Sequence, residues 1–216
     1  MSLNAKDKGG EDFKPIPAGL HNAVCYAVID IGTQPQLDPR FRAKQQSVFI
    51  WELPTERIEI EKDGVKKNLP RAISDFFTVS LSKKSNMRPM LESWRGKAFT
   101  EDELKGFNIG KVAGAGCQLN IVHERKNDKD RSVISAIVPL PKGLKLKAEN
   151  PIVTFDLEEW LKLKIATLPD SIPEWIKAKI MQSREWLDAR GGGAPDDGHG
   201  GEHTVGEAED GEEVPF

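Results

Sequence analysis

The fold is decided by the stretch Leu20-His-Asn-Ala-Val-Cys-Tyr-Ala-Val-Ile-Asp-Ile31. Successive side chains of a β-strand point to opposite faces of the sheet, so alternate residues share a face. One face of this stretch carries Leu20, Val24, Tyr26 and Val28, and the other carries Ala23, Cys25, Ala27, Ile29 and Ile31. Because both faces are apolar, we predict a long, twisted strand that contributes to the core on either side of a bend.

Further strands are predicted wherever apolar residues alternate with polar ones. They cover residues 45–53, with an extension over 56–61 beyond Pro54, and residues 73–81, 117–123 and 132–140. Asp63-Gly64 is a hairpin signal, since this pair accepts the positive φ angles of a tight turn. Between the third and fourth strands, the pattern predicts one short helix over 87–94 and a second that begins at Thr100, with Glu103 at capping-box spacing.

The order strand, strand, strand, helix, strand, strand predicts a mainly β protein with α additions. The matching architecture is a five-stranded OB-fold barrel with a helix between strands 3 and 4. An α+β sandwich is the alternative.

A helical extension is predicted after the barrel. Residues 153–155 are followed by a helix that starts at Asp156, and a single helix is expected from Pro173 to Arg190. The apolar stripe from Trp175 to Leu187 on this second helix either packs back on the barrel or forms a contact of a homodimer. The expected divisions are a disordered start over 1–12, a barrel domain over 13–149, a helical extension over 150–190 and a disordered acidic tail over 191–216.

Charge is distributed unevenly along the chain. The formal net charge is −3, but the residues from Gly191 onward include eight acids and no Lys or Arg. Removing these eight from the 34 acids leaves 26 against 31 bases, so residues 1–190 carry about +5. A basic body with an acidic tail is typical of a domain that binds a polyanion. A solubilising tail on an unrelated domain is the alternative.

Composition and motifs exclude several classes of protein. Cys25 and Cys117 each lie in an apolar run, which predicts buried free thiols in a reducing compartment, with a bridge between neighbouring strands as the alternative. The first twelve residues lack the apolar core of a signal peptide, and no apolar run approaches the roughly 20 residues of a membrane helix, so a soluble cytoplasmic protein is expected. The glycines around Lys111 do not have P-loop spacing, and His199 and His203 do not have the zinc-protease order. We therefore predict no catalytic residue, no metal and no cofactor.

Two segments resemble known proteins. The last ten residues, Glu207-Ala-Glu-Asp-Gly-Glu-Glu-Val-Pro-Phe216, resemble the acidic C-terminal tail of bacterial and phage single-stranded DNA-binding proteins, which ends in Ile-Pro-Phe. In the body, Ser80-Leu-Ser-Lys-Lys-Ser-Asn-Met87 and Trp94-Arg-Gly-Lys-Ala-Phe-Thr100 resemble a family of small phage proteins, some of which look like single-stranded DNA-binding proteins with an OB-fold. The body resemblance covers roughly residues 15–187.

The resemblance implies a protein that coats single-stranded DNA without sequence specificity during phage replication or recombination, in the host cytoplasm. The tail would then recruit a partner such as a polymerase, helicase, primase or nuclease. Its contact residues would be Asp210, Glu212, Glu213, Val214, Pro215 and Phe216. An OB-like interaction or assembly protein with no nucleic-acid role is the alternative.

Non-specific binding of a single strand requires aromatic side chains for the bases and cationic side chains for the phosphates. The candidates are Arg40, Phe41, Arg42 and Lys44 in the first loop, Trp51 on the second strand, Lys83, Lys84, Arg88 and Arg95 around the first helix, and Arg125, Lys126, Lys129 and Arg131 in the turn between strands 4 and 5. For Trp51 the alternative is a core position, with Glu52 facing water. The first loop and the last turn are expected to form the two walls of one groove.

The tail provides the first prediction. Its eight acids would compete with DNA for the basic body, so deleting residues 191–216 should tighten binding to oligo-dT. A fluorescence titration of both proteins at low salt measures this effect. Equal affinities would contradict the competition.

Overall fold

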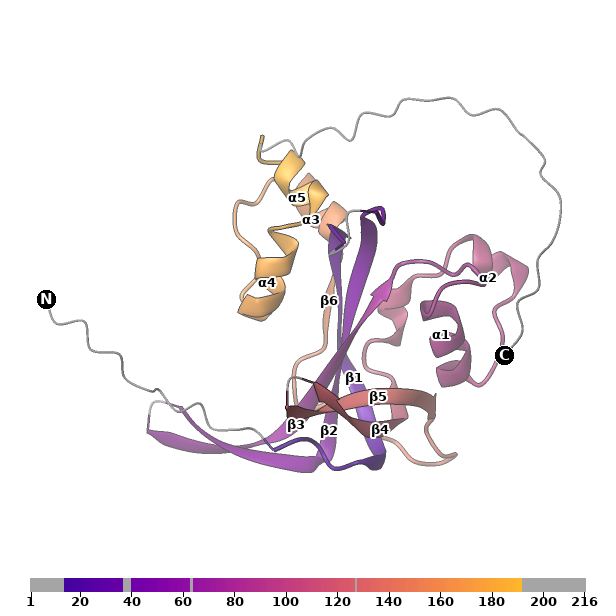
Figure 1. Ribbon diagram of the computed structural model, residues 1–216, viewed down its shortest axis with the longest axis vertical. Helices are drawn as coiled ribbons and strands as arrows, with labels where there is room; N and C mark the ends of the chain where they lie inside the picture. The colour runs from indigo at the N-terminus through magenta and orange to yellow at the C-terminus, as the bar shows by residue number, and fades with distance from the viewer. Residues whose placement is uncertain (1–13, 37–39, 63, 127, 192–216) are drawn as a thin grey trace, which may run out of the picture.

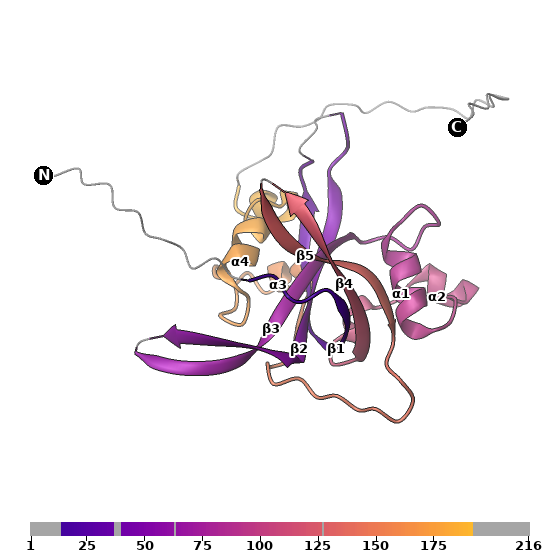
Figure 2. The same ribbon diagram turned by 60° about the horizontal axis from the view of Figure 1, so that its bottom comes forward.

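A sheet built around one long strand forms the body of the protein (Figures 1 and 2). The computed structural model describes residues 14–36, 40–62, 64–126 and 128–191. The elements in chain order are β1 (Gly19–Gln34), β2 (Lys44–Lys62), β3 (Val65–Thr78), α1 (Met87–Arg95), α2 (Glu101–Lys105), the 3-10 helix η1 (Ile109–Val112), β4 (Gly116–Lys126), β5 (Lys129–Pro139), β6 (Val153–Phe155), α3 (Leu157–Lys162), α4 (Glu174–Ile180) and α5 (Arg184–Asp188).

The strands follow the order β3-β2-β1-β4-β5, with every neighbour antiparallel, and the short β6 pairs parallel with β1. β1 is therefore shared: its first half pairs with β4 and its second half with β6, while β2 runs along its other edge. The mainly β class with helical additions is confirmed. Within the described residues, however, no pairing joins β3 to β5, so the sheet is open.

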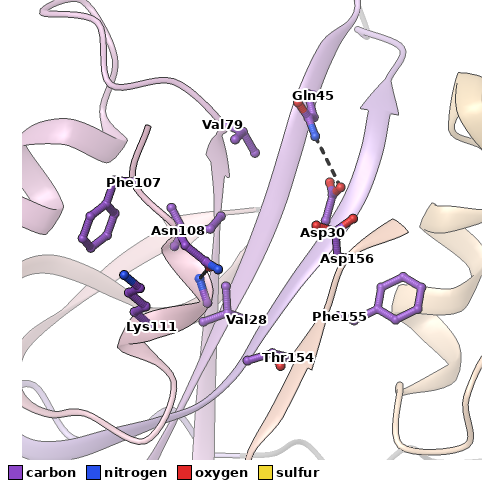
Figure 3. Close-up of a pocket in the computed structure, with 12 residues that line it drawn as sticks. Val28, Asp30, Gln45, Val79, Phe107, Asn108, Lys111, Thr154, Phe155 and Asp156 are labelled. Atoms are coloured by element: carbon purple, nitrogen blue, oxygen red, sulfur yellow. Dashed lines mark hydrogen bonds between the residues drawn. The ribbon is translucent and has the colours of Figure 1, made fainter. Parts of the chain in front are cut away.

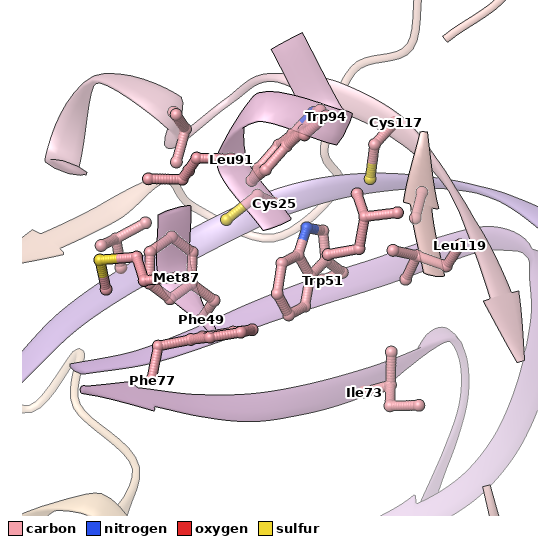
Figure 4. Packing of buried hydrophobic residues seen from close by; sticks show 14 of the residues in the cluster. Cys25, Phe49, Trp51, Ile73, Phe77, Met87, Leu91, Trp94, Cys117 and Leu119 are labelled. Atoms are coloured by element: carbon pink, nitrogen blue, oxygen red, sulfur yellow. The ribbon is translucent and has the colours of Figure 1, made fainter. Parts of the chain in front are cut away.

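One face of the sheet packs against α1 (Figure 4). This helix buries Met87, Leu91 and Trp94 at helical spacing. They contact Phe49 and Trp51 of β2, whose rings stack with centroids 5.8 Å apart. Asn86 precedes the helix and Gly96 ends it in the left-handed conformation with φ 66°. Cys25 and Cys117 lie in this cluster as buried free thiols.

The opposite face of the same strands packs against the C-terminal helices. It carries Ala27, Ile29, Ile31, Val48 and Ile50, which contact Leu157, Ile176, Ile180 and Trp186. Bulges in β1 between Cys25 and Ala27 and between Asp30 and Gly32 adjust which side chains point to each face. Burial of β1 on both faces is thus confirmed, but the predicted division of its residues is wrong: Val28 lies with Ala23 and Cys25 on the α1 side, whereas Ala27 and Ile29 face the C-terminal helices. The buried part of the helical stripe packs back on the sheet.

The single helix predicted from Pro173 to Arg190 is wrong, because the chain breaks it into α4 and α5. Ser183 is extended, with ψ 151°, and its Oγ accepts a hydrogen bond from Trp186 N at 3.3 Å. The same hydroxyl donates to Ile180 O at 2.7 Å. Ser183 therefore ends one helix and caps the next, and this turn directs both Ile180 and Trp186 toward β1.

Glu52 is buried rather than facing water, with no exposed surface. Its carboxylate accepts hydrogen bonds from Glu149 N at 2.6 Å, Asn150 N at 2.9 Å and Asn150 Nδ2 at 2.6 Å. Three N–H donors compensate for the loss of hydration of a buried carboxylate. Glu52 thus anchors the connection that leads to β6.

β2 also continues past Pro54, where a strand break was predicted. The register with β3 shifts between Leu53 and Arg57, so the strand bends and resumes pairing. The resulting arm, formed by residues 56–62 and 64–70, projects from the body (Figure 1).

Gly32 provides a test of how tightly the C-terminal helices pack on β1. Its φ is +72°, and a Cβ there would lie 2.7 Å from Leu157 Cδ2 and from Ser183 Cβ. Gly32→Ala should therefore lower the free energy of unfolding by about 2–4 kcal/mol, combining left-handed strain with overpacking. Urea denaturation measures the loss.

Gly143→Ala is the matched control, because its φ is +86° and its Cβ would meet nothing within 4 Å. This variant should lower the free energy of unfolding only by the cost of a left-handed backbone, about 1–2 kcal/mol. Equal losses in the two variants would show that α5 does not press on β1.

Candidate nucleic-acid interface

Trp51 cannot contact DNA in this structure, which corrects its place among the candidates. It has no exposed surface and lies between Phe49 and Trp94, 5.9 Å from the latter ring. The odd-numbered residues of this part of β2 face α1, so the strand alternation places Trp51 in the core.

Arg88 and Arg95 are held by the helical segment. Arg88 Nε donates to Glu92 at 3.0 Å, one helical turn away. Arg95 binds the carboxylate of Glu103, and its guanidinium lies 4.4 Å from the centre of the Phe99 ring. These contacts fix the approach of α1 to α2, so both arginines already have structural partners.

The first loop and the lysines after β3 lie at the same end of the sheet. Phe41 is 61% exposed, and the cationic side chains Arg40, Arg42 and Lys44 around it are exposed as well. β3 ends at Thr78, which pairs with Gln46, close to Lys44. Lys83 and Lys84 follow and are exposed. The structure therefore brings these two predicted groups together.

The turn between β4 and β5 lies at the other end of the sheet. Gly19, the first residue of β1, pairs with Ile121, and β4 runs on from there to Lys126. The first loop instead follows Gln34, the last residue of β1. About 50 Å of strand contour separates the two ends, at about 3.3 Å per residue. Arg125, Lys126, Lys129 and Arg131 are therefore not gathered with the first loop, and Arg131 pairs with Glu124 at 2.9 Å.

Sequence reasoning missed the pair of exposed aromatic side chains on the outer face of β3. Phe76 is 38% exposed and Trp175 of α4 is 46% exposed. Their rings meet edge to face with centroids 6.0 Å apart, and Lys179 Nζ lies 5.1 Å from the centre of the Phe76 ring. We call these three residues the Phe76–Trp175 platform. The Phe76-Phe77 doublet was the sequence signal for an aromatic side chain on the outer face, because one of two consecutive strand residues must face away from α1.

The platform lies on the same face of the sheet as Lys44. Phe76 pairs with Val48 and Thr78 with Gln46, so Lys44, two residues before Gln46, shares this face by alternation. The contour from Phe76 to the level of Lys44 is roughly 13 Å, or four residues of strand. One surface thus carries, one after another in space, an aromatic pair, a lysine and the basic first loop.

A cavity of about 580 Å³ lies on the opposite face, between β1, β6 and the segment Phe107–Lys111 (Figure 3). Asp30 and Asp156 line one end of it. Burial raises the pKa of Asp30, and the nearby charges of Asp156 and Glu185 raise it further, against hydrogen bonds from Gly32 N and Gln45. These carboxylates repel phosphate at their end of the cavity, whereas Lys111 lines it as well.

No family model, curated protein or solved structure matches this chain. Among the described residues, no group of three or more His, Cys, Asp or Glu side chains is placed to hold a metal ion. The helices of the described chain include none long and apolar enough to cross a membrane. The proposed tail contacts, Asp210 to Phe216, the predicted disordered start over 1–12, and all but Gly191 of the predicted disordered tail over 191–216 lie outside the described residues.

Asp30 provides a pH-dependent test. Its pKa is raised in the folded state, so its charged form destabilises the fold at pH 7, and this destabilisation disappears as the pH falls toward the ordinary value of 3.8. Asp30→Asn should raise Tm at pH 7 by roughly 2–4 °C, for a change on the order of 1 kcal/mol, with little gain near pH 4. Asn can still accept the hydrogen bond from Gly32 N.

Thermal denaturation followed by circular dichroism at both pH values measures the effect. Asp102→Asn is the control, because the Asp102 side chain is 91% exposed. A gain for Asp30→Asn that is the same at both pH values would contradict a titration effect.

Proposed function

We propose that the protein binds single-stranded DNA without sequence specificity, on the surface that runs from the Phe76–Trp175 platform to the first loop. The observation that carries this proposal is the platform itself: two half-exposed aromatic rings in contact, with Lys179 beside them, on the outside of a β-sheet. Each base that stacks on an aromatic side chain contributes about 1–3 kcal/mol, whatever its identity.

Cationic side chains along the same surface supply the second requirement. Lys179, Lys44 and the exposed Arg42 are placed to contact successive phosphates. The bases of a duplex are already stacked on each other, so the platform favours a single strand. We expect binding to weaken with salt, because phosphate contacts release counterions.

The strand arrangement supports an OB-fold for this protein. β1 pairs with both β2 and β4, and α1 lies between β3 and β4 in the chain, which is the order expected of that fold. An OB-fold sheet binds nucleic acid on the outer face of its second and third strands. Phe76 lies on that face of β3.

We further propose that the protein coats DNA during phage replication or recombination, with no catalytic role. The acidic tail would recruit a replication or recombination protein. The resemblance of the tail and of the Trp94-Arg-Gly96 segment to phage single-stranded DNA-binding proteins supports this part of the proposal.

An interaction protein with no nucleic-acid role is the second candidate, and the projecting arm favours it. Val65 is 56% exposed and Leu69 is 38% exposed. Leu69 pairs with Ile58, and the alternation places both residues on the same face as Val65. An apolar face on a two-stranded arm is suited to contact with another protein.

Titration of oligo-dT against a duplex of equal length, followed by anisotropy of labelled DNA at two salt concentrations, tests the proposal. We expect the single strand to bind more tightly, and added salt to weaken its binding. Phe76→Ala or Trp175→Ala should weaken binding by about 1–3 kcal/mol, or about 5- to 150-fold. Lys179→Gln should reduce the salt dependence by about 0.7 in the slope of log K against log salt.

Two controls separate stacking from folding. Trp175→Phe keeps an aromatic ring and should retain most of the affinity. Leu144→Ala truncates an apolar side chain that is 41% exposed on another surface, and should leave binding unchanged. Equal binding of single strand and duplex, or full affinity in Trp175→Ala, would overturn the assignment of the platform.

A further inference from the structure

Among the described strands, β3 and β5 each have one edge without a strand partner, and residues of both line one cavity. β3 and β5 both run in the direction of β1, because each is separated from it by two antiparallel pairings. They are the two ends of the strand order. In an antiparallel ladder, every second residue of an edge strand directs its N–H and C=O groups away from its partner. Both edges therefore carry backbone groups that a further strand can bind, except Ile137 O of β5, which already accepts a hydrogen bond from Ser93 Oγ of α1 at 2.6 Å.

A cavity of about 350 Å³ lies between these edges. We call it the seam; its walls are Asp75 and Phe77 of β3 and the segment Ile134–Ile137 of β5. Met90 and Pro89 of α1 line it as well and are apolar. The volume lies at the lower end of the range of ligand pockets.

An extended piece of this chain already bridges the same two strands. Arg71 of β3 donates hydrogen bonds to Pro15 O at 3.1 Å and to Lys14 O. Ser132 of β5 donates to Ile16 O at 3.1 Å, and the Ile16 side chain is only 4% exposed. Side chains of both edge strands thus bind the backbone carbonyls of residues 14–16, at positions of β3 and β5 that precede the residues lining the seam.

Asp75 adds a charge requirement to the seam. Burial raises the pKa of its carboxyl, against a hydrogen bond from Phe76 N. Among the described residues, no cationic side chain forms an ion pair with it. A carboxylate in a half-buried cavity favours a cationic ligand and disfavours phosphate, so the seam is distinct from the DNA surface proposed above.

We propose that the seam binds an extended peptide of a partner protein as an added strand. The peptide carries a Lys or Arg against Asp75 and, two residues away on the same face, an apolar side chain against Met90 and Ile134. Backbone hydrogen bonds to an edge provide affinity, and alternate side chains provide specificity, as in other cases of strand addition.

The probe is a labelled peptide, Thr-Ile-Thr-Lys-Thr-Val, blocked at both ends, in which Ile, Lys and Val share one face. The matched control peptide has Glu in place of Lys. Fluorescence polarisation with the full-length protein measures affinity, and hydrogen exchange of residues 72–78 and 132–137 locates the binding site. We expect the Lys peptide to bind about tenfold more tightly than the Glu peptide, a difference of about 1.4 kcal/mol, and to protect both edges.

Asp75→Asn should remove the preference between the two peptides, whereas Asp102→Asn should leave it intact. If Asp75→Asn does not fold, the comparison of the Lys and Glu peptides on the unmodified protein still tests the contact with Asp75. Equal affinities for the two peptides, or protection of other segments, would overturn the proposal.

Two other occupants are distinguishable by the same measurements. If a second copy of the chain fills the seam, the free protein sediments as a dimer with both edges already protected. If residues 1–13 fill it, both edges are protected in the monomer and lose protection when residues 2–12 are deleted. Either result would overturn the proposal, because the seam would then be filled by this chain and not by a partner peptide.

Discussion

The burial of β1 and β2 on both faces is the constraint on which the rest of the structure depends. An antiparallel sheet can leave one face in water, but here Phe49 and Trp51 on one side and Val48 and Ile50 on the other all lose their hydration. Two covers are therefore required. The segment between β3 and β4 supplies α1, and the residues after β5 supply α3 to α5. The C-terminal helices are thus part of the core.

The second cover also creates the candidate site. Glu52 holds the backbone at Glu149 and Asn150, so that the chain returns beside β1 as β6 and delivers the C-terminal helices to the outer face. Burial of Ile176 and Ile180 fixes the rotation of α4, which leaves Trp175 beside Phe76. Phe76 without α4 is a single exposed ring; with α4 it belongs to an aromatic pair with a lysine. The packing that stabilises the sheet therefore also positions the proposed stacking surface.

Local patterns predicted the elements well, and the errors arose where tertiary packing decides. Alternation predicted that β1 is buried on both faces, but not which residues share a face, because the bulges at Cys25/Ala27 and Asp30/Gly32 shift the pattern. The Thr100–Glu103 capping box is present because its signal is contained in four residues. Alternation also divides Phe76 from Phe77, but only the position of α4 shows that Phe76 stays partly exposed. Glu52 was assigned to water because its hydrogen-bond donors lie almost 100 residues away in the chain. The wall of basic residues expected from the β4–β5 turn failed for a geometric reason: β1 is long enough to keep its two ends apart.

The distribution of charge on the folded chain locates a surface for a polyanion, which its net charge cannot do. The excess of bases in residues 1–190 gives no location, since Arg88, Arg95 and Arg131 are paired with carboxylates. The cationic residues that share a surface with exposed aromatic rings lie at the start of β2, after the end of β3 and on α4. The two cavities nearby have the opposite character, with Asp30 and Asp156 in one and Asp75 in the other. A polyanion is therefore favoured on the surface with the aromatic rings and disfavoured beside these carboxylates, although Lys111 also lines the larger cavity. The two proposed ligands, a nucleic acid on one surface and a basic peptide on another, require this separation, because opposite charges in one groove would make the ligands compete.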